Sequence, residues 1–155
     1  MLIKYLVFLC SVLTCHVAFS QTETACIFSP AELSTTLGHI PEAGAASKDR
    51  LGMLHCQYKI KNVSERGFSV LINARCDQKR FEGNIKLKQS MSGKTVTVLD
   101  GYGDAAYFSA TGEAAVRVGT QCVELNGIRH AGTNRPITEA DVDKLLKLAA
   151  ARVKL

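Results

Sequence analysis

The chain has 155 residues, a formal net charge of +5 and a hydrophobic content of 46%. This length is enough for one domain behind an N-terminal targeting segment, but it is short for two. The excess of positive charge is mild, and basic and acidic residues are interspersed. The composition therefore gives no indication of a nucleic-acid partner.

Residues 1–20 have the layout of a secretory signal peptide. Lys4 supplies a positive start, an apolar run extends from Tyr5 to about Leu13, and Ala18 and Ser20 place small residues at the −3 and −1 positions. The run is shorter than the roughly 20 apolar residues of a membrane span. We therefore expect a periplasmic or secreted single domain over residues 21–155, with no transmembrane segment.

A lipoprotein anchored through Cys15 is the alternative to a cleaved signal peptide. Thr14 and Leu13 before it fit the usual small-residue pattern of lipid attachment poorly. We therefore favour cleavage after Ser20 over lipid anchoring.

Four cysteines follow the signal peptide: Cys26, Cys56, Cys76 and Cys122. An even number of cysteines in an exported chain favours two disulfides. Zinc sites usually bring their ligands in close pairs, whereas these cysteines are 30, 20 and 46 residues apart. The spacing therefore favours disulfides over a metal site, and we expect no cofactor.

The first elements are a short helix and a loop. Ser29 can cap a helix over about Pro30 to Leu37, Glu32 completes a capping box, and Gly38 is a natural stop. Residues 39–52 are rich in alanine, glycine and polar residues without clear periodicity, so we expect a surface loop there.

Two alternating runs then predict an antiparallel hairpin, from Met53 to Ile60 and from Phe68 to Cys76, with its turn near residues 62–67. This turn places Cys56 opposite about residues 71–73, and Cys76 lies several residues further along. A disulfide needs Cα atoms within about 7 Å, so Cys56–Cys76 is the least favoured pairing. We prefer Cys26–Cys56 with Cys76–Cys122.

The second half predicts a helix, about four strands and a closing helix. The helix runs from Asp77 to about Met91, and the strands include "TVTVL" (95–99), a short one at Tyr107 and Phe108, and a tight hairpin around Gly119-Thr120. Thr138 caps the last helix, which has Asp141 at its third position and carries an apolar stripe. Every neighbouring strand pair is expected to be antiparallel. The fold class is α+β, with a sheet of about five to six strands and flanking helices.

The hairpin around Gly119 poses a difficulty for the Cys76–Cys122 pairing. Its register pairs Val116 with Val123, which places Cys122 on the opposite face of the sheet, with Arg117. The pairing fits if helices cover both faces of the sheet, or if Cys122 lies at a strand end.

The stretch "GYGDAAYFSA" (101–110) contains two closely spaced glycines, as some phosphate-binding loops do. Such loops place their glycines immediately before a helix, so that free N–H groups point at the anion. Here the glycines follow one strand and precede another, and position 106 is alanine rather than the third glycine. The pattern favours a turn in which Gly101 or Gly103 has a positive φ.

This stretch, together with "ACIFSPAELSTTLG" and "CQY", resembles motifs of a family of small exported bacterial domains of unknown function, many of them actinobacterial lipoproteins. The resemblance covers most of the chain after the signal peptide. It implies an antiparallel sheet flanked by helices, similar to the PsbP-like fold, and it implies the pairing Cys26–Cys56. It brings no agreed activity and no catalytic residues. The sequence departs from the family in adding Cys76 and Cys122 and in lacking a convincing lipid-attachment site.

The sequence carries no convincing catalytic motif. The G-x-S-x-G elbow of many hydrolases is absent. His39, His55 and His130 are better interpreted as surface residues than as catalytic bases, and an enzyme would need one of them in a cleft with a serine or an acid. Asp141 and Asp143 form a close carboxylate pair, but the helix dipole explains the first of them.

We therefore expect a non-catalytic binding protein for an unknown small molecule or protein partner. The alternative is an immunity or inhibitor protein that neutralises a toxin in the periplasm. The candidate interaction residues lie on or beside the turn, where loops carry function: Tyr102, Asp104, Tyr107 and Phe108. For Asp104 the competing interpretation is a cap of the turn, and for Phe108 a position in the core.

Overall fold

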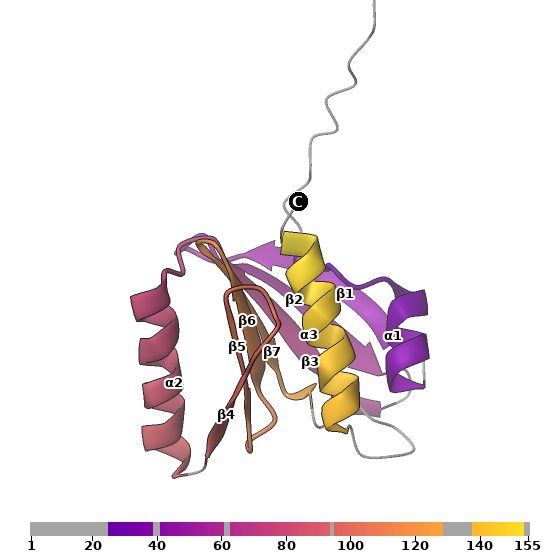
Figure 1. Ribbon diagram of the computed structural model, residues 1–155. Helices are drawn as coiled ribbons and strands as arrows, with labels where there is room; N and C mark the ends of the chain where they lie inside the picture. Colours follow the sequence, from indigo (N-terminus) through magenta and orange to yellow (C-terminus); the bar gives the residue numbers. More distant parts are fainter. Residues whose placement is uncertain (1–24, 39–40, 61–62, 94, 129–137, 154–155) are drawn as a thin grey trace, which may run out of the picture.

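The computed structural model describes residues 25–38, 41–60, 63–93, 95–128 and 138–153 (Figure 1). The expected signal peptide, Cys15 included, lies outside these ranges. The helices are α1 (Pro30–Leu37), α2 (Gln78–Ser92) and α3 (Glu139–Val153). The strands are β1 (Pro41–Lys48), β2 (Leu54–Ile60), β3 (Val63–Asn73), β4 (Val96–Leu99), β5 (Ala105–Ser109), β6 (Ala114–Val118) and β7 (Gln121–Asn126).

The strands form one antiparallel sheet in the order β1-β2-β3-β7-β6-β5-β4. Two runs of consecutive strands, β1 to β3 and β4 to β7, meet where β3 pairs with β7. Helix α2 covers one face of the sheet, and α1 and α3 cover the other (Figure 1). The expected α+β class and the antiparallel pairing are confirmed.

The helices begin and end where the sequence predicts. At α1, the Ser29 side chain accepts a hydrogen bond from the Glu32 backbone N–H, and the Glu32 carboxylate accepts one from the Ser29 N–H. The bond from the Ser29 N–H to the carboxylate is the main reason that the pKa of Glu32 lies below its ordinary value. Asp77 caps α2, and Thr138 and Asp141 exchange hydrogen bonds at the start of α3. Each cap satisfies N–H groups that the helix leaves free.

Two buried clusters hold the layers together. The larger one lies between the sheet and the α1–α3 layer. In it, the Tyr58 ring stacks on Phe68 at 4.9 Å, while the Tyr58 hydroxyl accepts from the Phe28 N–H and donates to the Phe28 carbonyl. The smaller cluster lies under α2 and includes Phe81, Tyr107 and both cysteines of one disulfide. Both faces of the sheet therefore contribute to the core.

The two disulfides join Cys26 to Cys56 and Cys76 to Cys122, with Cα–Cα distances of 5.1 and 5.6 Å. This is the pairing preferred from the sequence. Cys122 does share a face with Arg117, as expected from the hairpin register. The second bond fits because α2 covers that face, which resolves the difficulty that the register posed.

Three expectations about the first half were wrong. Residues 41–48 form strand β1 rather than part of a loop, so the sheet has seven strands instead of five to six; residues 39–40 lie outside the described ranges. Strand β3 begins at Val63 and ends at Asn73, so most of the expected turn, residues 63–67, belongs to the strand. A register shift after Lys59 shortens the connection and places Cys56 opposite Val70, rather than opposite residues 71–73.

Candidate functional site

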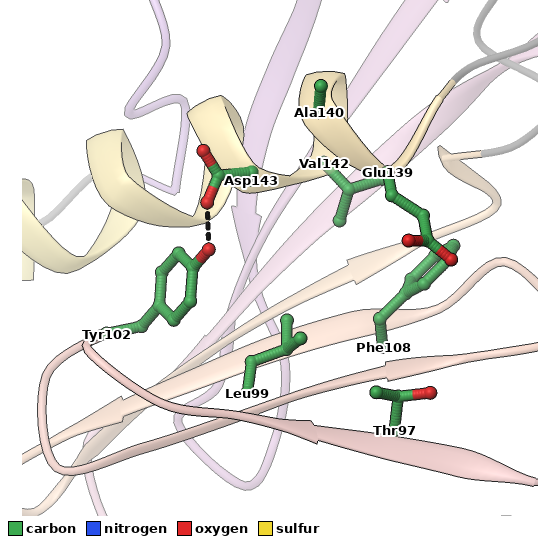
Figure 2. A pocket seen from close by; sticks show the side chains of 8 residues that line it. All are labelled: Thr97, Leu99, Tyr102, Phe108, Glu139, Ala140, Val142 and Asp143. Carbon is green, nitrogen blue, oxygen red and sulfur yellow. Dashed lines mark hydrogen bonds between the residues drawn. The ribbon is translucent and has the colours of Figure 1, made fainter.

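A cavity of about 340 Å³ lies between the first half of α3 and strands β4 and β5 (Figure 2). We call it the α3 pocket. Its lining consists of eight residues: Thr97, Leu99, Tyr102, Phe108, Glu139, Ala140, Val142 and Asp143. Its volume is at the lower end of the range for small-molecule sites.

Side chains along β4 and β5 point alternately to the two faces of the sheet, and those that line the α3 pocket point toward α3. Thr97 and Leu99 point to this face, whereas their neighbour Val96 is buried in the cluster under α2. Phe108 lies opposite Thr97 in the β4–β5 register. Val142 closes the pocket from the apolar face of α3 that is buried against the sheet. The two-residue alternation of the strands and the apolar face of the helix thus bring these side chains together.

The turn that carries Tyr102 is tied to α3. The Tyr102 hydroxyl donates a hydrogen bond to Asp143 (Figure 2). Asp143 also accepts from Lys147 at 2.9 Å, and the Lys147 Nζ lies 5.7 Å from the centroid of the Tyr102 ring. These contacts fix one wall of the pocket. The glycines on either side of Tyr102 have φ values of +87° and +57°, which confirms a turn with positive φ.

The chemistry of the α3 pocket is an apolar base with a polar, acidic rim. Leu99, Phe108 and Val142 supply apolar side chains, which we call the base, and α3 supplies the carboxylates of Glu139 and Asp143, which we call the rim. Its eight lining residues include no lysine, arginine or histidine. Such a lining can surround an apolar group and contact a polar or positively charged one.

The structure separates the four candidate interaction residues. Tyr102 and Phe108 line the α3 pocket, although Phe108 also belongs to the core and is only 9% exposed. Asp104 caps the neighbouring β6–β7 turn, where it accepts from the Gly119 N–H at 2.6 Å. Tyr107 points to the opposite face of the sheet. An interaction role for Tyr102 and Phe108 remains a prediction, and the other two do not share their site.

Tyr107 belongs to the cluster under α2, where its ring lies 5.5 Å from that of Phe81. Burial raises the pKa of Tyr107 well above its ordinary value. The side chain is almost fully buried in this cluster, so its position indicates a packing role.

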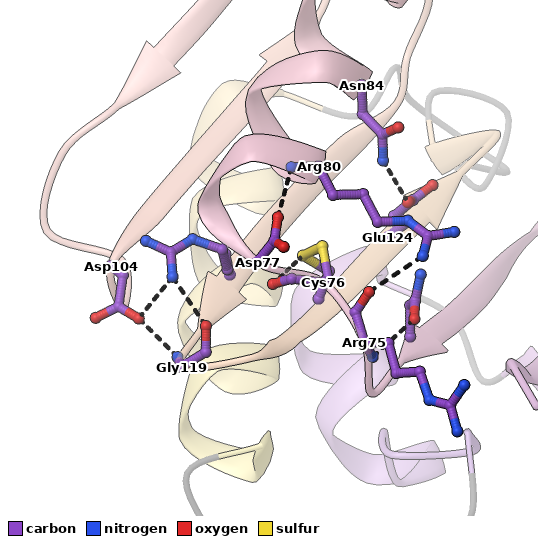
Figure 3. The surroundings of a disulfide bond; sticks show 11 residues. Arg75, Cys76, Asp77, Arg80, Asn84, Asp104, Gly119 and Glu124 are labelled. Carbon is purple, nitrogen blue, oxygen red and sulfur yellow. Dashed lines mark hydrogen bonds and ion pairs between the residues drawn. A yellow bond between two sulfur atoms is a disulfide. The ribbon is translucent and has the colours of Figure 1, made fainter.

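Away from the α3 pocket, several polar side chains surround the Cys76–Cys122 disulfide at the start of α2 (Figure 3). Asn84 donates to Glu124 at 3.5 Å, and burial raises the pKa of the Glu124 carboxyl. Arg117 pairs with Asp104 at 3.3 Å and donates to the Gly119 carbonyl at 2.8 Å. These contacts fasten α2 and the β6–β7 turn to the sheet, so we assign this group a structural role.

Of the histidines His39, His55 and His130, only His55 lies within the described ranges. It neighbours Cys56, which is buried toward α1 and α3, so strand alternation directs His55 to the other face, away from the α3 pocket. Across the described ranges, no three histidine, cysteine or acidic side chains are grouped as metal ligands would be.

Sequence patterns alone do not identify most of the α3 pocket. Asp141 and Asp143 are a close pair in the sequence, but the structure turns them apart: Asp141 is buried at the helix cap, and Asp143 reaches Tyr102. Glu139, one turn before Asp143, is a lining residue that the sequence interpretation missed. The available signal was helical periodicity, since residues 139, 142 and 143 share a side of the helix.

Comparisons with known proteins identified no relative of this chain. No family model, no curated protein and no solved structure matches the chain significantly. Among the helices of the described residues, none combines the length and the apolar character needed to cross a membrane.

Proposed function

We propose that the protein is an exported, non-catalytic binding protein that takes a small ligand in the α3 pocket. The observation that carries this proposal is the pocket itself, whose apolar base is enclosed by α3 and by the tethered turn around Tyr102. Small-molecule sites typically combine such an apolar lining with a few placed polar groups.

We propose in addition that the protein is exported to an oxidising compartment. The two disulfides suit an oxidising compartment, such as a periplasm or the exterior of a cell. The signal-peptide layout of residues 1–20 supports this location. We also propose the kinship with small exported bacterial domains of PsbP-like fold; the motifs and the antiparallel sheet between helices support it.

The test is native mass spectrometry of the oxidised protein, purified from an envelope extract. We expect a bound small molecule at one per chain. Ala140→Trp would fill the pocket from an exposed position on α3, and the bound molecule should be lost. Ala151→Trp makes the same change at an exposed position of α3 outside the pocket lining, and the molecule should be retained.

Two outcomes would contradict the proposal. The first is a co-purifying molecule that both tryptophan variants retain, since it would bind elsewhere. The second is a chain without a small molecule that captures one stoichiometric protein partner with a toxic domain. This second result would establish the immunity or inhibitor alternative.

A further inference from the structure

The charged side chains that line the α3 pocket are both acidic, Glu139 and Asp143, and Lys147, which pairs with Asp143, is not one of the lining residues. Glu139 and Asp143 are four residues apart on α3 and therefore lie on the same side of the helix, one turn apart. In Figure 2, Glu139 extends from α3 toward the base of the pocket, and Asp143 stands at the Tyr102 end. An anionic ligand would meet two carboxylates and no lining cation.

The helix start does not account for both of these carboxylates: Glu139 lies in the first turn of α3, where the helix dipole favours an acid, but Asp143 lies beyond that turn. An acid near a helix start is stabilised by the helix dipole, and Asp141 serves that purpose: it is 3% exposed and bonded to Thr138. Glu139 and Asp143 flank Asp141 in the sequence, but both line the pocket. The acidic rim is therefore a feature of the pocket in addition to the cap.

The structure already shows this wall holding an ammonium group. The Lys147 Nζ lies 2.9 Å from Asp143 and 5.7 Å from the centroid of the Tyr102 ring. A carboxylate beside an aromatic face attracts an ammonium through both charge and cation–π interaction. Glu139, at the other end of the rim, is exposed and would be the principal carboxylate available to a ligand.

We propose that the α3 pocket binds a small primary amine with an apolar body, its ammonium at the Glu139–Asp143 rim and its body on Leu99, Phe108 and Val142. This assignment rests on the proposed function. A cavity of about 340 Å³ holds roughly ten non-hydrogen atoms at about 30 Å³ each. A ligand that fills the pocket is thus about the size of an arylalkylamine.

The experiment compares three probes that share one apolar body: 2-phenylethylamine, 2-phenylethanol and phenylacetate. Binding to the oxidised protein is measured by titration, with backbone amide resonances as the readout. We expect the amine to shift the amides of Leu99, Tyr102 and Ala140, and to bind about tenfold more tightly than the alcohol. Phenylacetate should bind more weakly than the alcohol.

Matched variants separate charge from shape. Glu139→Gln should weaken amine binding about fivefold and leave the alcohol unchanged, because it removes the charge at nearly constant volume. Glu82→Gln makes the same change at an exposed position on α2, across the sheet, and should affect neither probe. Added salt should weaken the amine more than the alcohol.

Several outcomes would overturn the assignment. If the alcohol or phenylacetate shifts the same amide resonances and binds as tightly as the amine, the pocket does not select for a positive charge. A small-ligand function would still stand. If Glu139→Gln has no effect on the amine, the rim does not bind the ammonium. If no probe shifts the pocket amides, an amine is excluded, and native mass spectrometry still decides separately whether a ligand of another class is present.

Discussion

Gly103 is the position in the "GYGD" turn where a single methyl group should have the largest effect. Its φ is +57°, and a Cβ added there would lie 2.5 Å from the Arg117 carbonyl oxygen and 2.6 Å from Val118 Cγ2. Gly101, two residues earlier, has a φ of +87°, but a Cβ there meets nothing within 4 Å. Alanine would be strained by the positive φ at either position, but only at position 103 would its Cβ also collide with other atoms.

The magnitudes follow from this difference. Alanine at either position adopts the left-handed region, at a cost of roughly 1 to 2 kcal/mol. At Gly103 the methyl group also displaces backbone, since Asp104 donates to the same Arg117 carbonyl at 2.9 Å. Overpacking of this kind costs a further ~1–3 kcal/mol. Gly101→Ala should therefore lower the free energy of unfolding by about 1 kcal/mol, and Gly103→Ala by about 3 kcal/mol.

Urea denaturation of the oxidised variants, monitored by circular dichroism, measures both changes. The m-values should be unchanged, because the surface exposed on unfolding is the same. Gly103→Ala should also shift the amides of Tyr102 and Asp104 in the folded state. Equal losses for the two variants would refute the reasoning, because contact with Arg117 would then have no part in the choice of glycine.

Three further predictions concern the interior. Tyr58→Phe leaves the N–H and carbonyl of Phe28 without their buried partner, and should lower the free energy of unfolding by about 2 kcal/mol; a loss below about 0.5 kcal/mol in urea denaturation would contradict this. Replacing both Cys76 and Cys122 by alanine opens a loop of 46 residues, and should cost about 4 kcal/mol in the same assay, while an unchanged midpoint would show that the bond adds no stability. Burial raises the pKa of Glu124 in the folded state, so ionisation of Glu124 opposes folding above that raised pKa, and the penalty vanishes below its ordinary value of 4.5. Glu124→Gln should therefore raise the free energy of unfolding at pH 8 but not at pH 4; a gain of the same size at both values would argue against this cause.

The sequence predicted the elements whose own residues determine them. The three helices carry capping residues and glycine stops or an apolar stripe, and their ends agree with those signals. Strand β1 carries none of these signals: "PEAGAASK" lacks β-branched and aromatic residues, and the described side chains Glu42, Ala46, Ser47 and Lys48 are exposed. Its extended form depends on pairing with β2, and it is an edge strand. Composition cannot reveal a strand specified by its neighbour.

The α3 pocket could not be predicted from the sequence for a related reason. The sequence places Tyr102 in a turn, but its partner Asp143 is 41 residues away. The contact depends on how α3 crosses the sheet over β4 and β5, and no local pattern encodes that placement. Phe108 shows the same limit, since the sequence could not decide between core and binding surface, and the structure places it both in the core and in the lining of the α3 pocket.

The order of the disulfides along the chain bears on how the protein would fold during the proposed export. Cys26 pairs with Cys56 before Cys76 and Cys122 are reached, so the two loops are consecutive and neither encloses the other. In a chain that crosses a membrane N-terminus first, each of these pairs would consist of neighbouring cysteines in order of emergence. Simple sequential oxidation would then give the native bonds without reshuffling. The loop from Cys26 to Cys56, which contains α1 and β1, could then be closed covalently while the β4–β7 half is still being delivered.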